Sequence, residues 1–220
     1  MKQNSVIIFD LDDTLYKEID FVDSAFKHID KFLANEYKVY NTYEVMIHAQ
    51  HKGKNPFDAI LCDKFTIDEL LKLYRFHMPN IRLSDVTIDV LSRLHSEGYT
   101  LGLITDGRSI SQRNKIEALH LNKYFDNENI IISEVFGSEK TDIRNYQYFT
   151  TKFPRAKHFY YIGDNPTKDF INANLLGWTT ICLRDNGTNI HRQDIEIDDK
   201  YKPKIIINDL TDLYNIIFKS

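Results

Sequence analysis

The 220-residue chain has little cysteine, tryptophan or proline, and it has no long hydrophobic run. Its two cysteines, Cys62 and Cys182, lie far apart and have no neighbours that suggest a metal-binding pair. We interpret them as free thiols, which is typical of a cytoplasmic protein, with a disulfide as the alternative. No apolar segment approaches the roughly 18 residues that a transmembrane helix needs. The apolar run at residues 6–9 is interrupted at once by acidic residues, which argues against a signal peptide.

The chain also lacks an excess of basic residues. It has 28 Lys and Arg against 32 Asp and Glu, a formal net charge of −4 with His neutral. Domains that bind nucleic acid are normally basic, so we expect no nucleic-acid partner. The content of 42% hydrophobic and 27% charged residues is that of an ordinary globular protein and excludes a wholly disordered chain. A chain of this length corresponds to one domain with a modest insertion.

Apolar strand-like segments alternate with amphipathic helical segments over most of the chain, which predicts an α/β protein with a doubly wound parallel sheet. In such a sheet, ligands bind beyond the carboxyl ends of the strands. The predicted strands are residues 6–10, 99–104, 130–135, 158–162, 179–183 and 205–207. The predicted helices are residues 85–97, between Ser84 as N-cap and Gly98 as the terminating glycine, and residues 109–119, 142–153, 166–176 and 210–218.

Residues 17–80 interrupt this alternation. Apolar residues recur there at helical spacings of three and four, first over residues 21–33 and again over residues 42–49 and 67–76, with a turn-rich loop at residues 52–56. We interpret residues 17–80 as a helical cap domain inserted into a core domain formed by residues 1–16 and 81–220.

Carboxylates follow three of the predicted strands. Asp10 and Asp12 lie at the end of the first strand, Asp106 follows the second, and Asp164 and Asp169 follow the fourth. Because Asp10, Asp164 and Asp169 would repel one another in a single site, the site needs a cation, and oxygen ligands of this kind suit Mg²⁺. Lys140 opens a helix between them and would add a second positive charge. This combination predicts a Mg²⁺ site that binds a phosphoryl group.

Four segments of the chain resemble, in order, the motifs of the haloacid dehalogenase (HAD) superfamily of phosphohydrolases. They are the sequence Asp-Leu-Asp-Asp-Thr at residues 10–14, Thr-Asp-Gly at residues 105–107, Lys140, and the segment from Gly163 to Asp169. The resemblance covers residues 1–16 and 81–220 and implies a Rossmann-like core. The helical insertion between the first two motifs resembles the C1 cap of that superfamily. Only 33 positions separate Gly107 from Lys140, too few for the large cap of other branches.

The resemblance implies catalytic and metal-binding roles. Asp10 matches the nucleophile that forms an aspartyl phosphate. Asp12 matches the general acid that protonates the leaving oxygen and later activates water. Lys140 matches the lysine that stabilises negative charge on the nucleophile and the phosphate. The implied Mg²⁺ ligands are Asp10, the carbonyl of Asp12, and Asp164.

The resemblance also implies how the phosphoryl group is held. Thr105, the backbone amide of Asp106, Gly107 and Lys140 match the substrate-binding positions, and Asp169 matches a supporting acid that orients Lys140 or a metal-bound water. Asp106 stands where many members of the superfamily have Asn. The role of the backbone amide survives that difference.

The predicted function is therefore that of a cytoplasmic, Mg²⁺-dependent phosphatase, a hydrolase that acts on a small-molecule phosphate monoester through an aspartyl-phosphate intermediate. A haloacid dehalogenase on the same fold would lack the second acid of the first motif, here Asp12. A phosphomutase would keep all of these residues and stays open as an alternative, as does a non-catalytic binding protein. No membrane partner is expected, and the sequence specifies neither the substrate nor the oligomeric state.

Overall fold

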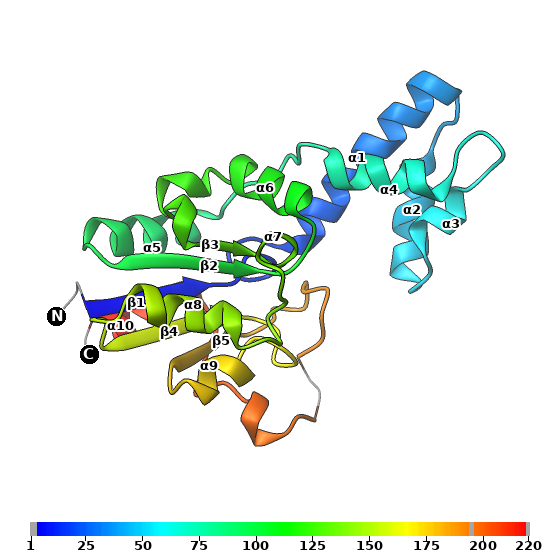
Figure 1. Cartoon of the computed structure of the whole chain (residues 1–220). Coiled ribbons are helices and arrows are strands. Elements are labelled where there is room, and N and C mark those ends of the chain that lie inside the picture. Colours follow the sequence, from blue (N-terminus) through cyan, green and yellow to red (C-terminus); the bar gives the residue numbers. More distant parts are fainter. Residues whose placement is uncertain (1–3, 194–195, 219–220) are drawn as a thin grey trace.

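A six-stranded parallel sheet forms the centre of the larger part of the molecule (Figure 1). The computed structural model describes residues 4–193 and 196–218; residues 1–3, 194–195 and 219–220, which belong to the predicted core segments, lie outside the described residues. The sheet order is β3-β2-β1-β4-β5-β6. The strands are β1 (Ser5–Phe9), β2 (Thr100–Thr105), β3 (Ile130–Ile132), β4 (His158–Gly163), β5 (Thr179–Leu183) and β6 (Ile205–Ile207).

Strand β1 lies at the point where the strand order reverses. All five of its residues are buried, as expected of a strand that helices cover on both faces. Phe9 is in register with Leu103 of β2 and Ile162 of β4. The residues that follow these three positions therefore emerge side by side at the carboxyl edge of the sheet. This is the place where ligands bind in doubly wound folds.

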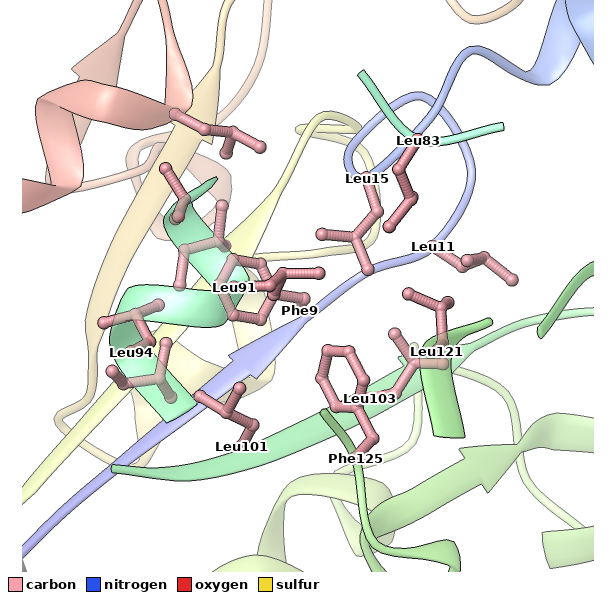
Figure 2. Close-up of a cluster of buried hydrophobic side chains, with 14 of the residues drawn as sticks. Phe9, Leu11, Leu15, Leu83, Leu91, Leu94, Leu101, Leu103, Leu121 and Phe125 are labelled. Carbon is pink, nitrogen blue, oxygen red and sulfur yellow. The ribbon is translucent and has the colours of Figure 1, made fainter. Parts of the chain in front are cut away.

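Helices pack on both faces of the sheet. Ile7 and Phe9 of β1 join an apolar cluster with α5, α6 and α10, part of which Figure 2 shows around Phe9 and Leu91. Val6 and Ile8 point to the opposite face, in keeping with the two-residue period of a strand, and contact a cluster that includes residues of α8 and α9. The helices are α5 (Asp85–Ser96), α6 (Ser109–Ala118), α7 (Ser133–Phe136), α8 (Arg144–Lys152), α9 (Ile171–Leu175) and α10 (Leu213–Ile217).

Residues 17–80 form four helices beyond the carboxyl edge of the sheet (Figure 1). They are α1 (Glu18–Tyr37), α2 (Thr42–His51), α3 (Pro56–Ile60) and α4 (Ile67–Phe76). These helices enclose an apolar cluster of their own, which includes Phe26, Leu33 and Met46. The boundaries of the two domains stay a prediction. Short 3-10 helices occur at Leu121–Lys123, Asn127–Asn129, Asp199–Tyr201 and Leu210–Asp212.

Many of the predicted elements are confirmed. The hydroxyl of Ser84 accepts a hydrogen bond from the backbone N–H of Thr87 at 3.1 Å, and Gly98 ends the helix with φ +79°. Both cysteines are free. Within residues 4–193 and 196–218, no helix is both long enough and apolar enough to span a bilayer.

Two predicted segments were wrong in extent. The predicted strand at residues 130–135 ends at Ile132. Beyond it, the hydroxyl of Ser133 accepts a hydrogen bond from the backbone N–H of Gly107, and the carboxylate of Glu134 accepts one from that of Ser109. The predicted helix at residues 166–176 begins only at Ile171. Its expected first turn is replaced by hydrogen bonds to the side chains of Asn165 and Asp169. Helix α3, capped by Asn55, was not predicted; it begins at Pro56, the last residue of the loop expected at residues 52–56.

Candidate active site

The residues that carry the predicted chemistry meet at the carboxyl edge of the sheet. A pocket of about 160 Å³ is lined by Asp10, Asp12, Thr105, Asp106, Lys140 and Asp164. Asp169 lies completely buried in direct contact with Lys140. Gly107 is the one predicted residue of this group that neither lines the pocket nor contacts Lys140 among the described interactions. Its backbone N–H donates to the hydroxyl of Ser133 at 3.0 Å.

Lys140 is a buried ammonium that joins two carboxylates. Its Nζ lies 2.5 Å from Oδ1 of Asp10 and 2.8 Å from Oδ1 of Asp169, and the residue is only 1% exposed. Burial alone would lower the pKa of Lys140, but the charges of the two carboxylates outweigh that effect and raise its pKa well above the usual value. The ammonium is therefore charged, and its position next to Asp10 allows it to stabilise negative charge there.

Asp169 organises the loop that follows β4. One carboxylate oxygen contacts Lys140, while the other accepts hydrogen bonds from the backbone N–H groups of Asp164 at 3.2 Å and Asn165 at 2.8 Å. A Cβ on Gly163 would lie 2.5 Å from this second oxygen, so a side chain there would displace the carboxylate. The close approach of backbone and carboxylate explains the glycine in this motif.

Three buried carboxylates lie close together at this edge of the sheet. Asp10, Asp164 and Asp169 each offer an oxygen, and these oxygens lie within 4.8 Å of one another. Burial is the largest cause that raises the pKa of Asp10 to about 7, against the lowering effect of Lys140. Burial, followed by the charges of Asp10 and Asp169, raises the pKa of Asp164 to about 9.

These carboxylates fit a divalent cation. Three buried carboxylates face the single buried ammonium of Lys140, so the groups carry more negative than positive charge when all are ionised. The donor set consists entirely of oxygen, which suits Mg²⁺. Both oxygens of Asp169 already have hydrogen-bond donors. Asp10 and Asp164 are consequently the side chains best placed to hold an ion.

Asp12 occupies a different environment from Asp10, although only one residue separates them. Its Oδ1 accepts hydrogen bonds from Tyr16 Oη at 2.5 Å and Lys115 Nζ at 2.7 Å, and its Oδ2 accepts one from Gln112 Nε2 at 2.9 Å. Burial acts to raise the pKa of Asp12, but the charge of Lys115 and these hydrogen bonds outweigh it and hold the pKa below the ordinary value. Sequence reasoning missed Tyr16, Gln112 and Lys115 because none belongs to a motif.

The segment after β2 supplies a hydroxyl and an unexpected carboxylate. Thr105 is 1% exposed, and its Oγ1 accepts a hydrogen bond from Gln112 Nε2 at 2.9 Å. The carboxylate of Asp106 accepts a hydrogen bond from the backbone N–H of Lys140 at 3.0 Å and lies 3.4 Å from Lys168 Nζ. The side chain of Asp106 thus ties two further segments together, whereas only its backbone amide had been predicted to matter.

Two lining residues come from outside the predicted motifs. Glu18 begins α1, and His191 lies between β5 and β6. Asp13 connects the start of α1 to the loop that contains His191, because its carboxylate accepts hydrogen bonds from the backbone N–H of Glu18 at 3.0 Å and of Ile190 at 2.9 Å. Burial, followed by the charge of Asp12, raises the pKa of Glu18 to about 7. No periodicity or spacing marks Glu18 or His191 in the sequence.

Known proteins of similar sequence are phosphatases by name. The chain is 30% identical over 228 residues to a glyceraldehyde 3-phosphate phosphatase from Methanocaldococcus jannaschii, with 96% of each protein covered. It is 26% identical over 236 residues to a protein of the same name from Pyrococcus furiosus, with 99% of this chain and 94% of the relative covered. These names agree with the predicted phosphatase branch.

Solved structures share the fold. The putative HAD-hydrolase YfnB from Bacillus subtilis, described as bound to magnesium, has a TM-score of 0.66 at 22% identity and covers 98% of this chain and 99% of its own. A HAD phosphatase from Thermococcus onnurineus has a TM-score of 0.62 at 20% identity, with 97% of both chains covered. The predicted α/β fold with a parallel, Rossmann-like sheet is confirmed.

The match to a protein family spans most of the molecule. It extends over residues 7–183 and so includes the last three residues of β1, strands β2 to β5 and the helical insertion. The predicted superfamily and the predicted enzyme class, a hydrolase, are both confirmed. On this match and on the nearly complete alignment with the Methanocaldococcus jannaschii relative, the chain belongs to the haloacid dehalogenase-like hydrolase family.

Proposed function

We propose that this hydrolase is a Mg²⁺-dependent phosphatase that cleaves a small-molecule phosphate monoester through an aspartyl phosphate on Asp10. The observation that carries the proposal is the pairing of Asp10 with the buried ammonium of Lys140, 2.5 Å away, at the floor of a pocket that Asp12 also lines. Asp12 favours phosphatase chemistry over a dehalogenase, because dehalogenases of this fold lack the second acid of the first motif.

The proposed reaction has two steps. In the first, a carboxylate oxygen of Asp10 attacks phosphorus, the bond from phosphorus to the leaving oxygen breaks, and Asp12 gives a proton to that oxygen. In the second, Asp12 takes a proton from a water whose oxygen attacks phosphorus, the bond from phosphorus to the Asp10 oxygen breaks, and inorganic phosphate and the free Asp10 carboxylate are formed. The Lys115 ion pair lowers the pKa of Asp12 in the free protein, and the negative charge of a bound phosphate would raise it.

Other residues of the pocket would bind the phosphoryl group. Lys140 Nζ and Thr105 Oγ1 supply donors that face it, together with the backbone amide of Asp106 and, as the resemblance implies, Gly107. Asp169 would support Lys140. A Mg²⁺ ion held by Asp10, Asp164 and the carbonyl of Asp12 would neutralise charge on the phosphoryl oxygens.

For the substrate, we propose a short phosphorylated compound of the size of glyceraldehyde 3-phosphate. Relatives that carry this substrate in their name align along nearly the whole chain. The pocket of about 160 Å³ is in keeping with a small substrate. We propose further that residues 17–80 act as a cap, since Glu18 of α1 lines the pocket, and that the protein is cytoplasmic, which its two free thiols support.

Phosphate release from a panel of phosphate monoesters, with Mg²⁺ and with chelator, tests the proposal. Release is expected with Mg²⁺ only, fastest from triose phosphates, and it should fall by at least about 10⁴-fold in Asp10→Asn, which removes the nucleophile at nearly constant volume. Near-wild-type release by the pure variant would contradict the assignment of Asp10. Conversion of a sugar phosphate into its isomer without phosphate release would identify a phosphomutase instead.

A further inference from the structure

Helix α6 holds both carboxylate oxygens of Asp12. Lys115 Nζ contacts Oδ1 at 2.7 Å, and Gln112 Nε2 contacts Oδ2 at 2.9 Å. The two donors are three positions apart in the sequence, so they lie on the same side of α6. Asp12 itself belongs to the turn that follows β1, where a short side chain has several rotamers available. Contacts to both oxygens restrict it to one of them.

Lys115 carries a buried ammonium group. The residue is 4% exposed, and its Nζ lies 4.3 Å from the centre of the Phe21 ring. Removing an ammonium from water is costly, and an apolar side chain of the same length would fill this position at lower cost. A buried ammonium at this position is explained if Asp12, the carboxylate with which Lys115 forms an ion pair, requires it.

Gln112 connects Asp12 to the phosphoryl-binding segment. The residue is 2% exposed, and its Nε2 also contacts Thr105 Oγ1 at 2.9 Å and the carbonyl oxygen of Asp106 at 2.7 Å. One amide group therefore touches the residue proposed to transfer protons and two residues proposed to hold the phosphoryl group. A movement of Gln112 would disturb their relative positions.

The same helix is attached to the insertion. Ser111 Oγ donates to the carbonyl oxygen of Arg75 at 3.2 Å, and Asn114 Nδ2 donates to that of His77 at 3.0 Å. These bonds bind α6 to the segment in which the chain returns from α4 toward the core. Helix α6 therefore forms hydrogen bonds both to the end of the insertion, through Ser111 and Asn114, and to Asp12 in the core, through Gln112 and Lys115.

We propose that Lys115 and Gln112 are positioning residues that hold the Asp12 carboxylate where it exchanges protons with the leaving group and with water. The inference rests on the proposed phosphatase function and adds to it two residues outside the four motifs. Neither residue touches the reacting atoms in this role. Both act through Asp12, and their effect should depend on how much the leaving group needs a proton.

Leaving-group dependence separates positioning from a merely structural role. Glyceraldehyde 3-phosphate has an alkoxide leaving group that needs protonation, whereas p-nitrophenyl phosphate has one that needs little. The measured quantity is kcat/KM, which reports the steps up to departure of the leaving group. In Lys115→Met it should fall about 10²-fold for the first substrate and about tenfold or less for the second. Lys115→Arg, which keeps the charge, should recover most of the loss.

Controls are available on the same helix. Arg113 is exposed on α6, and Arg113→Met should leave both rates unchanged. Gln112→Leu provides a second test in case Lys115→Met does not fold, and it should show the same preference for the better leaving group. In an Asp12→Asn background, Lys115→Met should cause little further loss, because both changes remove the same function.

Two results would overturn the inference while the proposed function stands. One is an equal loss for both substrates in folded Lys115→Met and Gln112→Leu. The other is a full additional loss when Lys115→Met is combined with Asp12→Asn. A wild-type protein that releases phosphate from neither compound would overturn the proposed function, and the inference with it.

Discussion

The carboxyl edge of the sheet and the helical insertion are stabilised in opposite ways. At the sheet edge, charged groups are buried against one another: Lys140, Asp10 and Asp169 are 1%, 5% and 0% exposed. In the insertion, the buried cluster is apolar and the ion pair of Lys27 with Asp23 lies at the surface, with side chains 62% and 35% exposed. Buried charges cost stability unless each is paired, whereas surface pairs contribute little. The sheet edge is therefore held by paired buried charges, and the insertion by apolar packing.

The largest effect should come from removing the charge that holds the sheet edge together. Lys140→Met leaves the carboxylates of Asp10 and Asp169 buried without their ammonium, and the free energy of unfolding should fall by about 3–5 kcal/mol. Phosphate release should also be lost, because charge on Asp10 is no longer stabilised. Denaturant unfolding in the presence of chelator measures the stability. A variant as stable as the wild type would show that the ion pairs of Lys140 with Asp10 and Asp169 do not contribute to the free energy of unfolding.

In the insertion, a comparable loss should require an apolar substitution. Leu33 is fully buried in the cluster of α1 to α4, and Leu33→Ala should cost about 2–5 kcal/mol through the cavity that it leaves. Hydrogen exchange should accelerate at the amides of α1 and α2 and not at those of β1, if residues 17–80 form a separate domain. Equal acceleration in β1 would show that the two regions unfold as one unit and would contradict the predicted boundaries.

Sequence reasoning succeeded where one local pattern determined the outcome. The buried run of β1, ending at Asp10, was identifiable because a doubly covered strand has no polar alternation. Helix α4 was predicted with both of its ends correct, since its apolar spacing begins directly after the capping residue Thr66. The same reasoning placed most carboxylates of the candidate site, because parallel strands bring their carboxyl ends to one edge.

The parts that sequence reasoning missed depend on contacts between distant segments. Lys115 resembles any other helical lysine until the fold brings it to Asp12, which is 103 positions away in the chain. His191 reaches the pocket because the neighbouring Ile190 amide binds Asp13, 177 positions away. The first turn expected at Pro166 is absent because Asp169 binds the backbone of its own loop instead. Hydrogen bonds of this kind, which compete with local backbone structure, produce no periodic pattern in the sequence.

Mg²⁺ should reduce the charge imbalance at the sheet edge and thereby stabilise the protein. A ligand that binds only the folded state adds about 2.7 kcal/mol at a concentration of one hundred times its Kd, so the Tm should rise with Mg²⁺ and fall again with chelator. Asp164→Asn should lose most of this shift, since Asp164 is one of the two side chains best placed to hold the ion. An equal shift in the wild type and in Asp164→Asn would place the binding of Mg²⁺ elsewhere.

The smallest effect should come from the charge pair on the insertion. Asp23 contacts Lys27 Nζ at 2.7 Å and accepts a hydrogen bond from Tyr43 Oη at 2.6 Å. In Asp23→Asn the amide oxygen can still accept from Tyr43, and the exposed ion pair that is lost contributes about 0.2–1 kcal/mol at most, decreasing with added salt. We expect unchanged phosphate release and a loss of unfolding free energy within that range, measured at low and high salt. The same change from Asp to Asn at Asp10 should abolish turnover, because it removes the proposed nucleophile, whereas Asp23 lies outside the candidate site. A large loss of activity in Asp23→Asn would show that the insertion also depends on its charges.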